Sequence, residues 1–244
     1  MGKDLKTIMF ATAVCVVCSL LLAGSYSALK SRQDANKLLD FRSKVLQVFG
    51  VPVMDAKGHR LMSGKEINDL FTSRVAGHVL DHEGHLTDKR VEDLTPEQIN
   101  ARDKAIGGLK AFYPYYEFTT DDGHKLYAIH VSGMGLWSVC KAYLALKDDF
   151  ETIAGIAFYE HAETPGLGGE IEKPKFQDQF KGKQLAKDGQ AEYFRVLRPS
   201  DAIDNASVHG PSGATMTSKG ITAFINSDYS VYHAYFQSLK QQGG

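Results

Sequence analysis

The stretch that organises this sequence is Ser212-Gly213-Ala214-Thr215-Met216-Thr217-Ser218, just before the last helical stretch of the chain. Two small residues precede a hydroxyl residue, and apolar residues then recur at helical spacing, at Ile221, Ile225, Tyr232, Phe236 and Leu239. We therefore predict a helix that begins near Thr215 and runs to about Lys240. At a helix start, free backbone N–H groups and the helix dipole favour an anionic phosphate. The alternative is an ordinary helix cap, which Ser and Thr often supply.

The whole string SGATMTS closely resembles the flavin-attachment motif of a known family, NqrC, which is the C subunit of the Na+-translocating NADH:quinone oxidoreductase (the Nqr complex). In that family a dedicated transferase joins FMN through its phosphate to the Thr that follows Gly-Ala, which corresponds to Thr215. The resemblance also implies a place at the flavin for Ser212, Gly213 and Ala214. The family usually carries Asp three positions before the Ser, where this chain has His209.

Two further stretches resemble motifs of the same family. Gly133-Met134-Gly135-Leu136-Trp137-Ser138 has glycines that mark a bend or a close backbone approach, and its Trp is either a core residue or a neighbour of the flavin. Glu163-Thr164-Pro165-Gly166-Leu167-Gly168 offers an apolar face at Leu167, and exposed amides with Thr164 can bond the polar edge of a ring. Phe180-Lys181-Gly182-Lys183 follows the family pattern too, and Lys183 either complements the phosphate charge or is a surface lysine. The flavin contacts expected outside the attachment motif are Glu163, Thr164, Leu167, Gly168, Trp137 and Lys183.

Composition sets outer limits on function. With 244 residues and a net charge of −1, the chain is long enough for one sizeable domain plus an anchor and has no basic surface for nucleic acid. The three cysteines give no disulfide framework, and Cys15-x-x-Cys18 lies in an apolar run without the strand–helix context of a redox motif. Redox chemistry in this chain therefore needs a cofactor.

The N-terminal part of the chain carries a long apolar run. No charged residue occurs from Thr7 to Leu29, which meets the roughly 20 apolar residues needed to span a bilayer. We predict an N-terminus at 1–6, a transmembrane helix at 7–29, a helical stalk at 30–50 and the main domain at 51–244; the alternative for the apolar run is a cleaved signal peptide. The family resemblance implies a bacterial inner membrane, with the N-terminus cytoplasmic and the main domain periplasmic.

The fold class that we predict is α+β, with hairpins forming an antiparallel sheet and helices at both ends. Capping boxes at Ser63-x-x-Glu66 and at Thr95–Gln98 predict two helix starts. The expected strands are 74–80, 112–118, 126–131, 143–146, 153–159 and 191–197. Alternation within the pair 143–146 and 153–159 makes Leu144, Leu146, Ile156 and Phe158 core candidates.

A histidine-rich stretch is the main competing signal. His78, His82 and His85 lie close together with two carboxylates, which would suit a metal-dependent hydrolase. The spacing does not match the His-Glu-x-x-His helix of a zinc protease, and the stretch is better explained as a strand, a turn at 81–84 and a second strand. We therefore predict no metal site.

The several motifs in order identify the chain as a member of the NqrC family. The resemblance implies a protein that carries covalent FMN and relays electrons between redox centres during ubiquinone reduction by NADH, coupled to Na+ export. The implied partners are the A, B, D, E and F components of the Nqr complex and a flavin transferase. No catalytic acid or base is expected, and the chain lacks the Gly-x-Gly-x-x-Gly nucleotide fingerprint needed for turnover alone. The alternatives are the related G subunit of the Rnf ferredoxin:NAD oxidoreductase and a stand-alone anchored flavin-binding domain for electron transfer or sensing.

Overall fold

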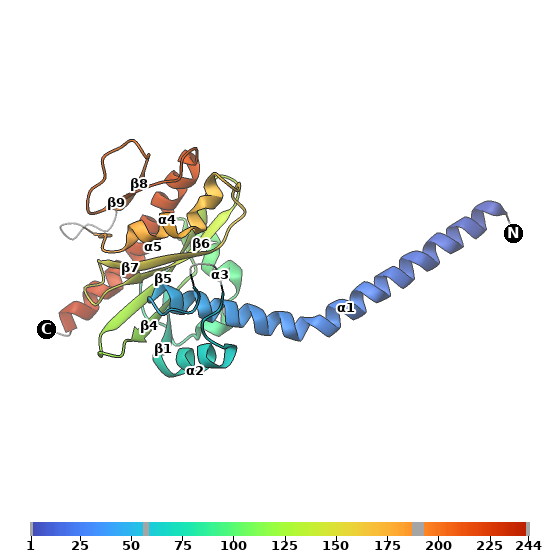
Figure 1. Cartoon of the computed structure of the whole chain (residues 1–244), viewed down its shortest axis with the longest axis horizontal. Helices are drawn as coiled ribbons and strands as arrows, with labels where there is room; N and C mark the ends of the chain where they lie inside the picture. Colours follow the sequence, from blue (N-terminus) through green and yellow to red (C-terminus); the bar gives the residue numbers. More distant parts are fainter. Residues whose placement is uncertain (1, 56–58, 187–192, 243–244) are drawn as a thin grey trace. The chain divides into compact units, whose positions relative to one another are not determined.

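The computed structural model describes residues 2–55, 59–186 and 193–242 (Figure 1). The chain divides into two compact units, Met1–Arg42 and Ser43–Gly244. Helix α1 (Lys3–Val48) forms the first unit from Lys3 onward, and its last residues belong to the second. Its stretch Asp4–Val48 is long and apolar enough to cross a membrane, with a mean hydropathy of 2.3 in its most apolar window and no burial of that window. The apolar run and the expected stalk thus form one continuous helix.

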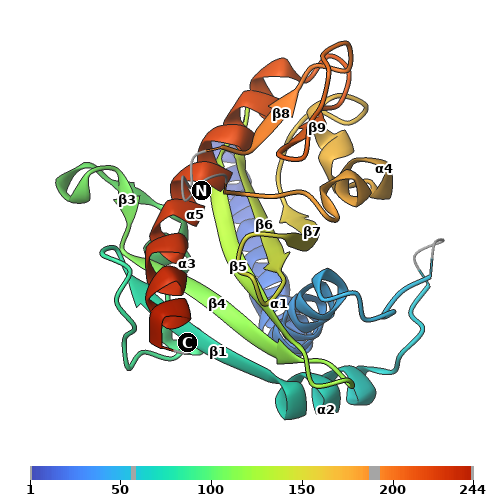
Figure 2. The ribbon, with the colours of Figure 1, turned by 90° about the vertical axis from the view of Figure 1, so that its left-hand side faces the viewer.

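The second unit is built on a five-stranded sheet with the strand order β1-β4-β5-β6-β7, in which every neighbouring pair is antiparallel (Figure 2). Its strands are β1 (Val75–Asp81), β4 (Phe112–Thr119), β5 (Lys125–Met134), β6 (Val139–Leu146) and β7 (Ile153–Glu160). The two predicted hairpins are β4–β5 and β6–β7, because alternating apolar residues and polar turns specify such pairs locally. The predicted α+β class is confirmed.

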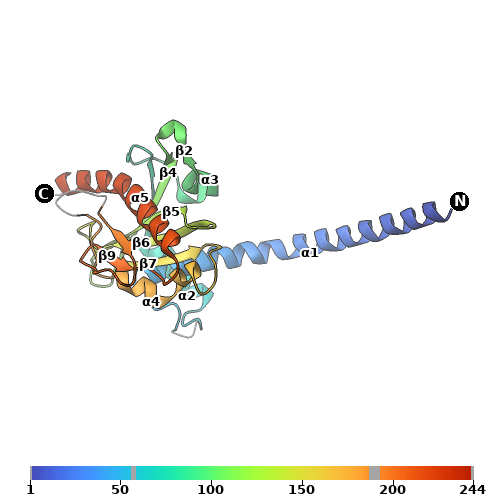
Figure 3. The same ribbon diagram turned by 90° about the horizontal axis from the view of Figure 1, so that it is seen from above.

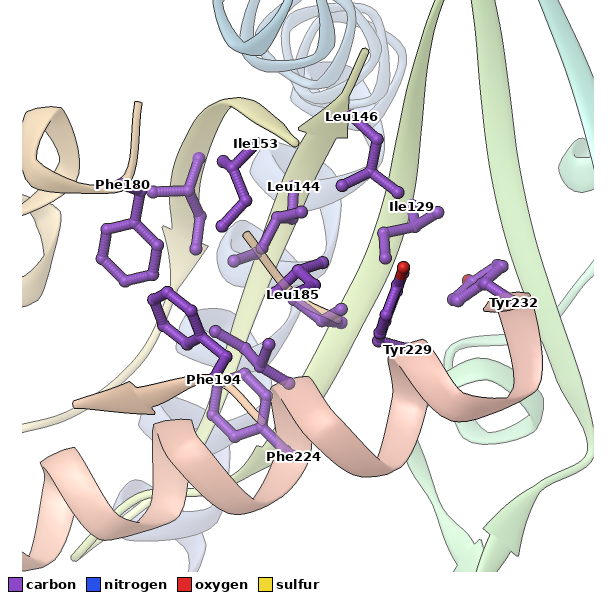
Figure 4. Packing of buried hydrophobic residues seen from close by; sticks show 14 of the residues in the cluster. Ile129, Leu144, Leu146, Ile153, Phe180, Leu185, Phe194, Phe224, Tyr229 and Tyr232 are labelled. Carbon is purple, nitrogen blue, oxygen red and sulfur yellow. The ribbon is translucent and has the colours of Figure 1, made fainter. Parts of the chain in front are cut away.

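Helix α5 (Thr215–Gln242) covers one face of the sheet (Figures 2 and 3). Figure 4 shows Phe224, Tyr229 and Tyr232 pointing from this helix toward the strands. They meet buried residues of β5, β6 and β7, and the four predicted core residues, Leu144, Leu146, Ile156 and Phe158, are all buried there. The main core therefore lies between α5 and the sheet.

The opposite face packs against α2 (Gly64–Arg74) and against the last residue of α1, since a Cβ on Gly155 of β7 would lie 2.8 Å from the Val48 carbonyl oxygen. Tyr115 of β4 meets Phe236 of α5 edge-on, whereas its neighbour Tyr116 meets Phe71 of α2. Because successive side chains of a strand point to opposite faces, α2 and α5 lie on opposite sides of the sheet. Phe49, just after α1, stacks on the Phe118 ring at 4.9 Å on the α2 side.

The remaining elements are short and surround the sheet. They are η1 (Val91–Asp93), α3 (Pro96–Asn100), β2 (Arg102–Asp103), η2 (Lys104–Ile106), β3 (Leu109–Lys110), η3 (Gly168–Glu172), α4 (Pro174–Gln177), η4 (Asp178–Phe180), β8 (Arg195–Leu197) and β9 (Ser207–His209). The predicted capping boxes at Ser63 and Thr95 are both present, at the starts of α2 and α3.

Three sequence expectations about strands need correction. The strand predicted at 191–197 is limited to Arg195–Leu197, with residues 191 and 192 outside the described chain, and it pairs in parallel with β9, away from the main sheet. The strand predicted from Arg74 begins at Val75, because Arg74 ends α2. The second strand expected after the 81–84 turn is reduced to a single bridge between Leu80 and Leu86, on the side of β1 that does not pair with β4.

Candidate functional site

The SGATMTS motif runs from the turn before α5 into the first turn of that helix. The helix begins at Thr215, as predicted, and a turn closed by the N–H of Ala214 donating to the Pro211 carbonyl at 3.2 Å leads into it. Gly213 has φ +74°, and a Cβ atom there would lie 2.8 Å from Leu167. The turn therefore requires glycine for its backbone conformation, and the missing side chain also leaves room for Leu167 of the 163–168 loop.

The motif holds four hydroxyl groups, and burial separates them. Thr217 is 1% exposed and Ser218 is 6% exposed, whereas Ser212 and Thr215 are both exposed. Of the two threonines, only Thr215 can be reached from solvent, and it lies at the positive end of the α5 dipole, among backbone N–H groups that have no partner within the helix.

Glu163 joins the three motifs into one site. Its carboxylate, 5% exposed, accepts hydrogen bonds from the backbone N–H groups of Leu136 at 3.2 Å, Trp137 at 2.9 Å and Ser138 at 3.1 Å. It also accepts from the Ser138 hydroxyl at 3.3 Å and from the Thr217 hydroxyl at 2.7 Å. A single side chain thus ties the 163–168 loop to the 133–138 turn and to α5.

These donors keep the carboxylate ionised. Burial acts to raise the pKa of Glu163, but the hydrogen bonds from the Thr217 hydroxyl and from the turn amides outweigh burial and hold the pKa below its ordinary value. The family resemblance implies contact between Glu163 and the flavin. In the structure, both carboxylate oxygens accept hydrogen bonds from protein donors.

Two glycines give the carboxylate its room. A Cβ on Gly168 would lie 2.7 Å from Thr217 Oγ1 and 2.8 Å from Glu163 Oε2, and a Cβ on Gly135 would lie 2.8 Å from Glu163 Oε1. Either side chain would displace the hydrogen bonds of Glu163. The prediction that glycines of this region mark close approaches is confirmed.

Exposed apolar side chains gather at the same motifs. Trp137 is 69% exposed, so it is not a core residue. Six of the nine large hydrophobic residues that are exposed in the described part of Ser43–Gly244 form what we call the apolar cluster: Met134, Leu136, Trp137, Val139, Leu167 and Met216. Such a concentration indicates a binding surface rather than chance exposure.

A cavity of about 350 Å³ opens beside Thr215. Gly213 and Thr215 line it together with the cationic residues Arg195, Arg198 and Lys219. Lys219 lies four residues after Thr215 and so on the same face of α5. The carboxyl residue Asp201 also lines the cavity, but the three cationic residues outnumber it. An exposed hydroxyl, a helix start and a net positive lining form an arrangement suited to a phosphate.

A second cavity, of about 480 Å³, lies on the Ser212 side and is lined also by Gly166, His209, Lys173 and Lys175. His209, which stands where the family usually has Asp, has its ring Nε2 2.8 Å from the Asp201 carbonyl.

Two of the residues expected to contact the flavin, Lys183 and Thr164, make other interactions in the structure. The Lys183 ammonium donates to the Asp204 carbonyl at 2.7 Å, and Lys183 lines neither of these two cavities. Thr164 is exposed, and its carbonyl accepts the N–H groups of Leu167 at 3.1 Å and Gly169 at 2.9 Å, which shapes the loop.

The histidines of the competing metal hypothesis are not brought together. His78 stacks on Tyr115 at 4.9 Å, within the sheet. Over the described residues, the group whose potential ligand atoms lie within 4.8 Å of one another is Asp81, Glu83 and His85, which lacks the other two histidines. Asp81 Oδ1 accepts the N–H groups of Glu83 and His85, so it closes the turn that the sequence predicts.

Sequence reasoning missed Thr217, Arg198 and Lys219. The four-residue spacing from Thr215 to Lys219 on a predicted helix was a usable signal for the lysine. Thr217 and Arg198 gave no local signal, because what makes them relevant is a contact or a cavity formed with distant parts of the chain.

Comparison with known proteins finds relatives that share the three motifs' part of the chain. Residues 135–229, which span most of the three motifs, match the family described as FMN-binding domain. The chain is 35% identical to the C subunit of the Na(+)-translocating NADH-quinone reductase of Pseudomonas aeruginosa, covering 91% of this chain and 89% of that protein. It is 32% identical to the corresponding protein of Yersinia pestis, covering 91% and 86%.

Two solved structures are also similar. The structure of the C subunit of this reductase from Parabacteroides distasonis superposes with a TM-score of 0.70 at 27% identity, covering 85% of this chain and 96% of that one. The Shewanella oneidensis NqrC structure gives a TM-score of 0.67 at 28% identity, covering 86% and 99%.

Proposed function

This chain belongs to the NqrC family of the Na+-translocating NADH-quinone reductase, and we propose that it carries FMN joined through a phosphoester to Thr215. The observation that carries the proposal is the difference in exposure between two threonines of one motif. Thr215 is exposed at the start of α5, whereas Thr217 is buried and committed to Glu163. Ser212 is also exposed, but it precedes the helix and lines the other cavity.

Attachment makes use of the hydroxyl of Thr215. With a flavin dinucleotide as the donor, the Thr215 oxygen would form the new bond to the phosphorus on the flavin side. The nucleoside monophosphate would depart with the electron pair of the P–O bond that breaks, and the hydroxyl proton would pass to the flavin transferase. The ester keeps a negative charge. The N–H groups at the start of α5 and the cationic Arg198 and Lys219 around the cavity would stabilise that charge.

The residues on the surface fit the rest of the cofactor. Trp137, Leu167 and Met216 expose apolar side chains around the attachment site, as a planar ring system requires. The exposed Thr164 and the loop beside it offer polar groups for the edge of the ring.

The proposed role is electron relay within the complex. FMN, when bound, accepts and releases electrons singly or in pairs. The chain would hold that group at a fixed site on the periplasmic side of the bacterial inner membrane, with α1 as a single-pass anchor. Electrons would pass between this site and redox centres in the other subunits during quinone reduction by NADH, coupled to Na+ export, and we expect no turnover from this protein alone.

The test is intact mass and in-gel ultraviolet fluorescence of the denatured full chain, produced together with the flavin transferase. We expect one FMN phosphoester and a fluorescent band in the wild type, and neither in Thr215→Val. Thr217→Val is the matched control, because it removes a hydroxyl of the same motif that is buried, and it should stay fluorescent. A dark wild-type chain, or a label that survives Thr215→Val, would overturn the proposal.

A second measurement separates a component of the complex from a stand-alone flavin domain. If the chain works inside the complex, the tagged full-length protein should co-purify from mild detergent with the other reductase subunits. Recovery of the flavinylated chain by itself, under conditions that keep the rest of the complex assembled, would favour the stand-alone alternative.

A further inference from the structure

Glu163 belongs to one of the flavin-site motifs, yet its carboxylate faces the protein interior. It is 5% exposed, and both oxygens accept hydrogen bonds from protein donors. We propose that Glu163 is a positioning residue, whose carboxylate holds the Leu136–Ser138 turn, and with it the exposed indole of Trp137, against the helix turn that carries Thr215. The inference rests on the proposed function, because it concerns the same flavin site.

One side of the carboxylate organises the turn. The N–H groups of three successive residues, Leu136, Trp137 and Ser138, converge on Glu163 Oε1. The turn is also closed by the Gly135 N–H donating to the Ser138 carbonyl at 2.8 Å. Successive N–H groups that point inward form an anion-binding nest, and here the anion is a side chain of the same protein. The backbone of Trp137 is thereby fixed while its side chain stays 69% exposed.

The other side of the carboxylate reaches α5. Oε2 accepts the Thr217 hydroxyl at 2.7 Å, and Thr217 lies two residues after Thr215 in the first turn of the helix. The spacing between the Trp137 backbone and the attachment residue is therefore set through one carboxyl group. Gly168 and Gly135 lie so close to this group that neither tolerates a Cβ.

Within the described part of the chain, no hydrogen bond or ion pair runs directly from the Leu136–Ser138 turn to α5. Met134 comes close to the helix, since a Cβ on Gly220 would lie 2.2 Å from the Met134 carbonyl, but that contact is made before the turn begins. From Leu136 to Ser138, the turn is linked to α5 by hydrogen bonds that pass through the Glu163 carboxylate. A defect at Glu163 should then loosen the turn and leave the strand ends in place.

The chain offers a direct reporter of this effect, because Trp137 is its only tryptophan. The experiment uses the full chain in detergent, with and without FMN attached, and compares wild type with Glu163→Ala, Glu163→Gln and Thr217→Val. The readouts are the steady-state fluorescence anisotropy of Trp137, the visible circular dichroism of the bound flavin, and the intact mass. Glu160→Gln is the matched control, because it removes an exposed carboxylate three positions earlier, where Glu160 pairs with Lys141.

In Glu163→Ala we expect FMN still attached by mass, a loss of Trp137 anisotropy and a loss of the flavin dichroism. Glu163→Gln should keep most of both signals, since its amide oxygen can still accept the turn N–H groups. Thr217→Val should reduce the flavin dichroism more than the Trp137 anisotropy. Glu160→Gln should match wild type.

The inference is overturned if Glu163→Ala melts at a lower temperature but keeps wild-type anisotropy and dichroism below that temperature, since Glu163 would then be only structural. If Glu163→Ala does not fold, equal signals in Thr217→Val and wild type overturn it instead. A wild-type chain without FMN would refute the proposed function, and the anisotropy of that chain and its variants would still test Glu163.

Discussion

The Thr217 hydroxyl donates to the Glu163 carboxylate across 2.7 Å, between residues 54 positions apart in the chain. This bond joins α5 to the 163–168 loop, in a place where both side chains are buried. The Thr217 hydroxyl is therefore buried and not accessible for reaction, whereas Thr215, two residues earlier, is the exposed threonine of the motif. One hydrogen bond therefore contributes both to the shape of the site and to which threonine can react.

We expect Thr217→Val to destabilise the protein by about 2 kcal/mol at neutral pH, since hydrogen bonds to charged groups contribute about that much. The pKa of Glu163 is lower in the folded chain than its ordinary value, so the stabilisation is present above that ordinary value and is lost as the pH falls through the folded pKa. The difference between variant and wild type should therefore narrow in acid. Thermal unfolding followed by circular dichroism at neutral and acidic pH measures it.

Thr217→Ser retains a hydroxyl and serves as the control, with a smaller loss than Thr217→Val at neutral pH. An equal loss for Thr217→Val at both pH values would mean that the ionised carboxylate does not contribute to the effect.

Asp228 should be the most sensitive charged residue away from the site. It is fully buried, its Oδ2 lies 2.5 Å from the buried Lys110 ammonium and 2.8 Å from the Ser132 N–H, and its Oδ1 accepts Arg102 at 2.7 Å. In Asp228→Asn the ammonium loses its partner in a place where burial already lowers the pKa of Lys110. We expect a loss of about 3–5 kcal/mol, because removing one partner strands a buried charge. Chemical unfolding measures it.

Two controls test that explanation. Asp178→Asn breaks an exposed pair with Lys181 and should change stability by less than about 1 kcal/mol. Adding Lys110→Met to Asp228→Asn should recover part of the loss, because the stranded charge is then gone. If the double variant is no more stable than the single one, the damage comes from lost packing or from Arg102 instead.

His209→Asp should speed attachment of FMN. His209 lies three positions before Ser212, where the family resemblance implies Asp, and its ring contacts the Asp201 carbonyl rather than the α5 start. We expect a higher initial rate of label incorporation with the transferase, measured by in-gel fluorescence over time, and no change in the residue labelled. An unchanged rate would mean that the transferase recognises this chain without a carboxylate at that position.

The features predicted correctly from the sequence are those set by residues close together in the chain. Alternating residues in β6 and β7 placed Leu144 and Phe158 in the core, and the small residues before Thr215 marked the start of α5. Strand periodicity and helix starts are set by contacts within a few residues, so they can be inferred from a single sequence.

What the sequence did not predict depends on distant partners. The carboxylate of Glu163 points inward because it accepts hydrogen bonds from Leu136, Trp137, Ser138 and Thr217. These donors lie 25 to 27 and 54 positions away in the chain, so the sequence around Glu163 does not reveal them. A lone tryptophan is most often a core residue, yet Trp137 is exposed because the nest holds its backbone at the tip of a turn. β8 pairs in parallel with β9, a nonlocal arrangement without the hairpin signature that revealed the main sheet.

Two sets of cationic side chains could stabilise the phosphate, Lys183 or the pair Lys219 and Arg198. The family pattern suggests Lys183, but its ammonium donates to the Asp204 carbonyl, whereas Lys219 and Arg198 line the cavity beside Thr215. We expect Lys219→Ala and Arg198→Ala each to slow FMN attachment several-fold, with the largest effect at low salt, because exposed charges are screened as ionic strength rises. Lys183→Ala is the matched lysine control and should leave the rate near wild type. A slower rate in Lys183→Ala alone would instead assign the phosphate to the lysine of the family pattern, and the cavity at the start of α5 would then have another occupant.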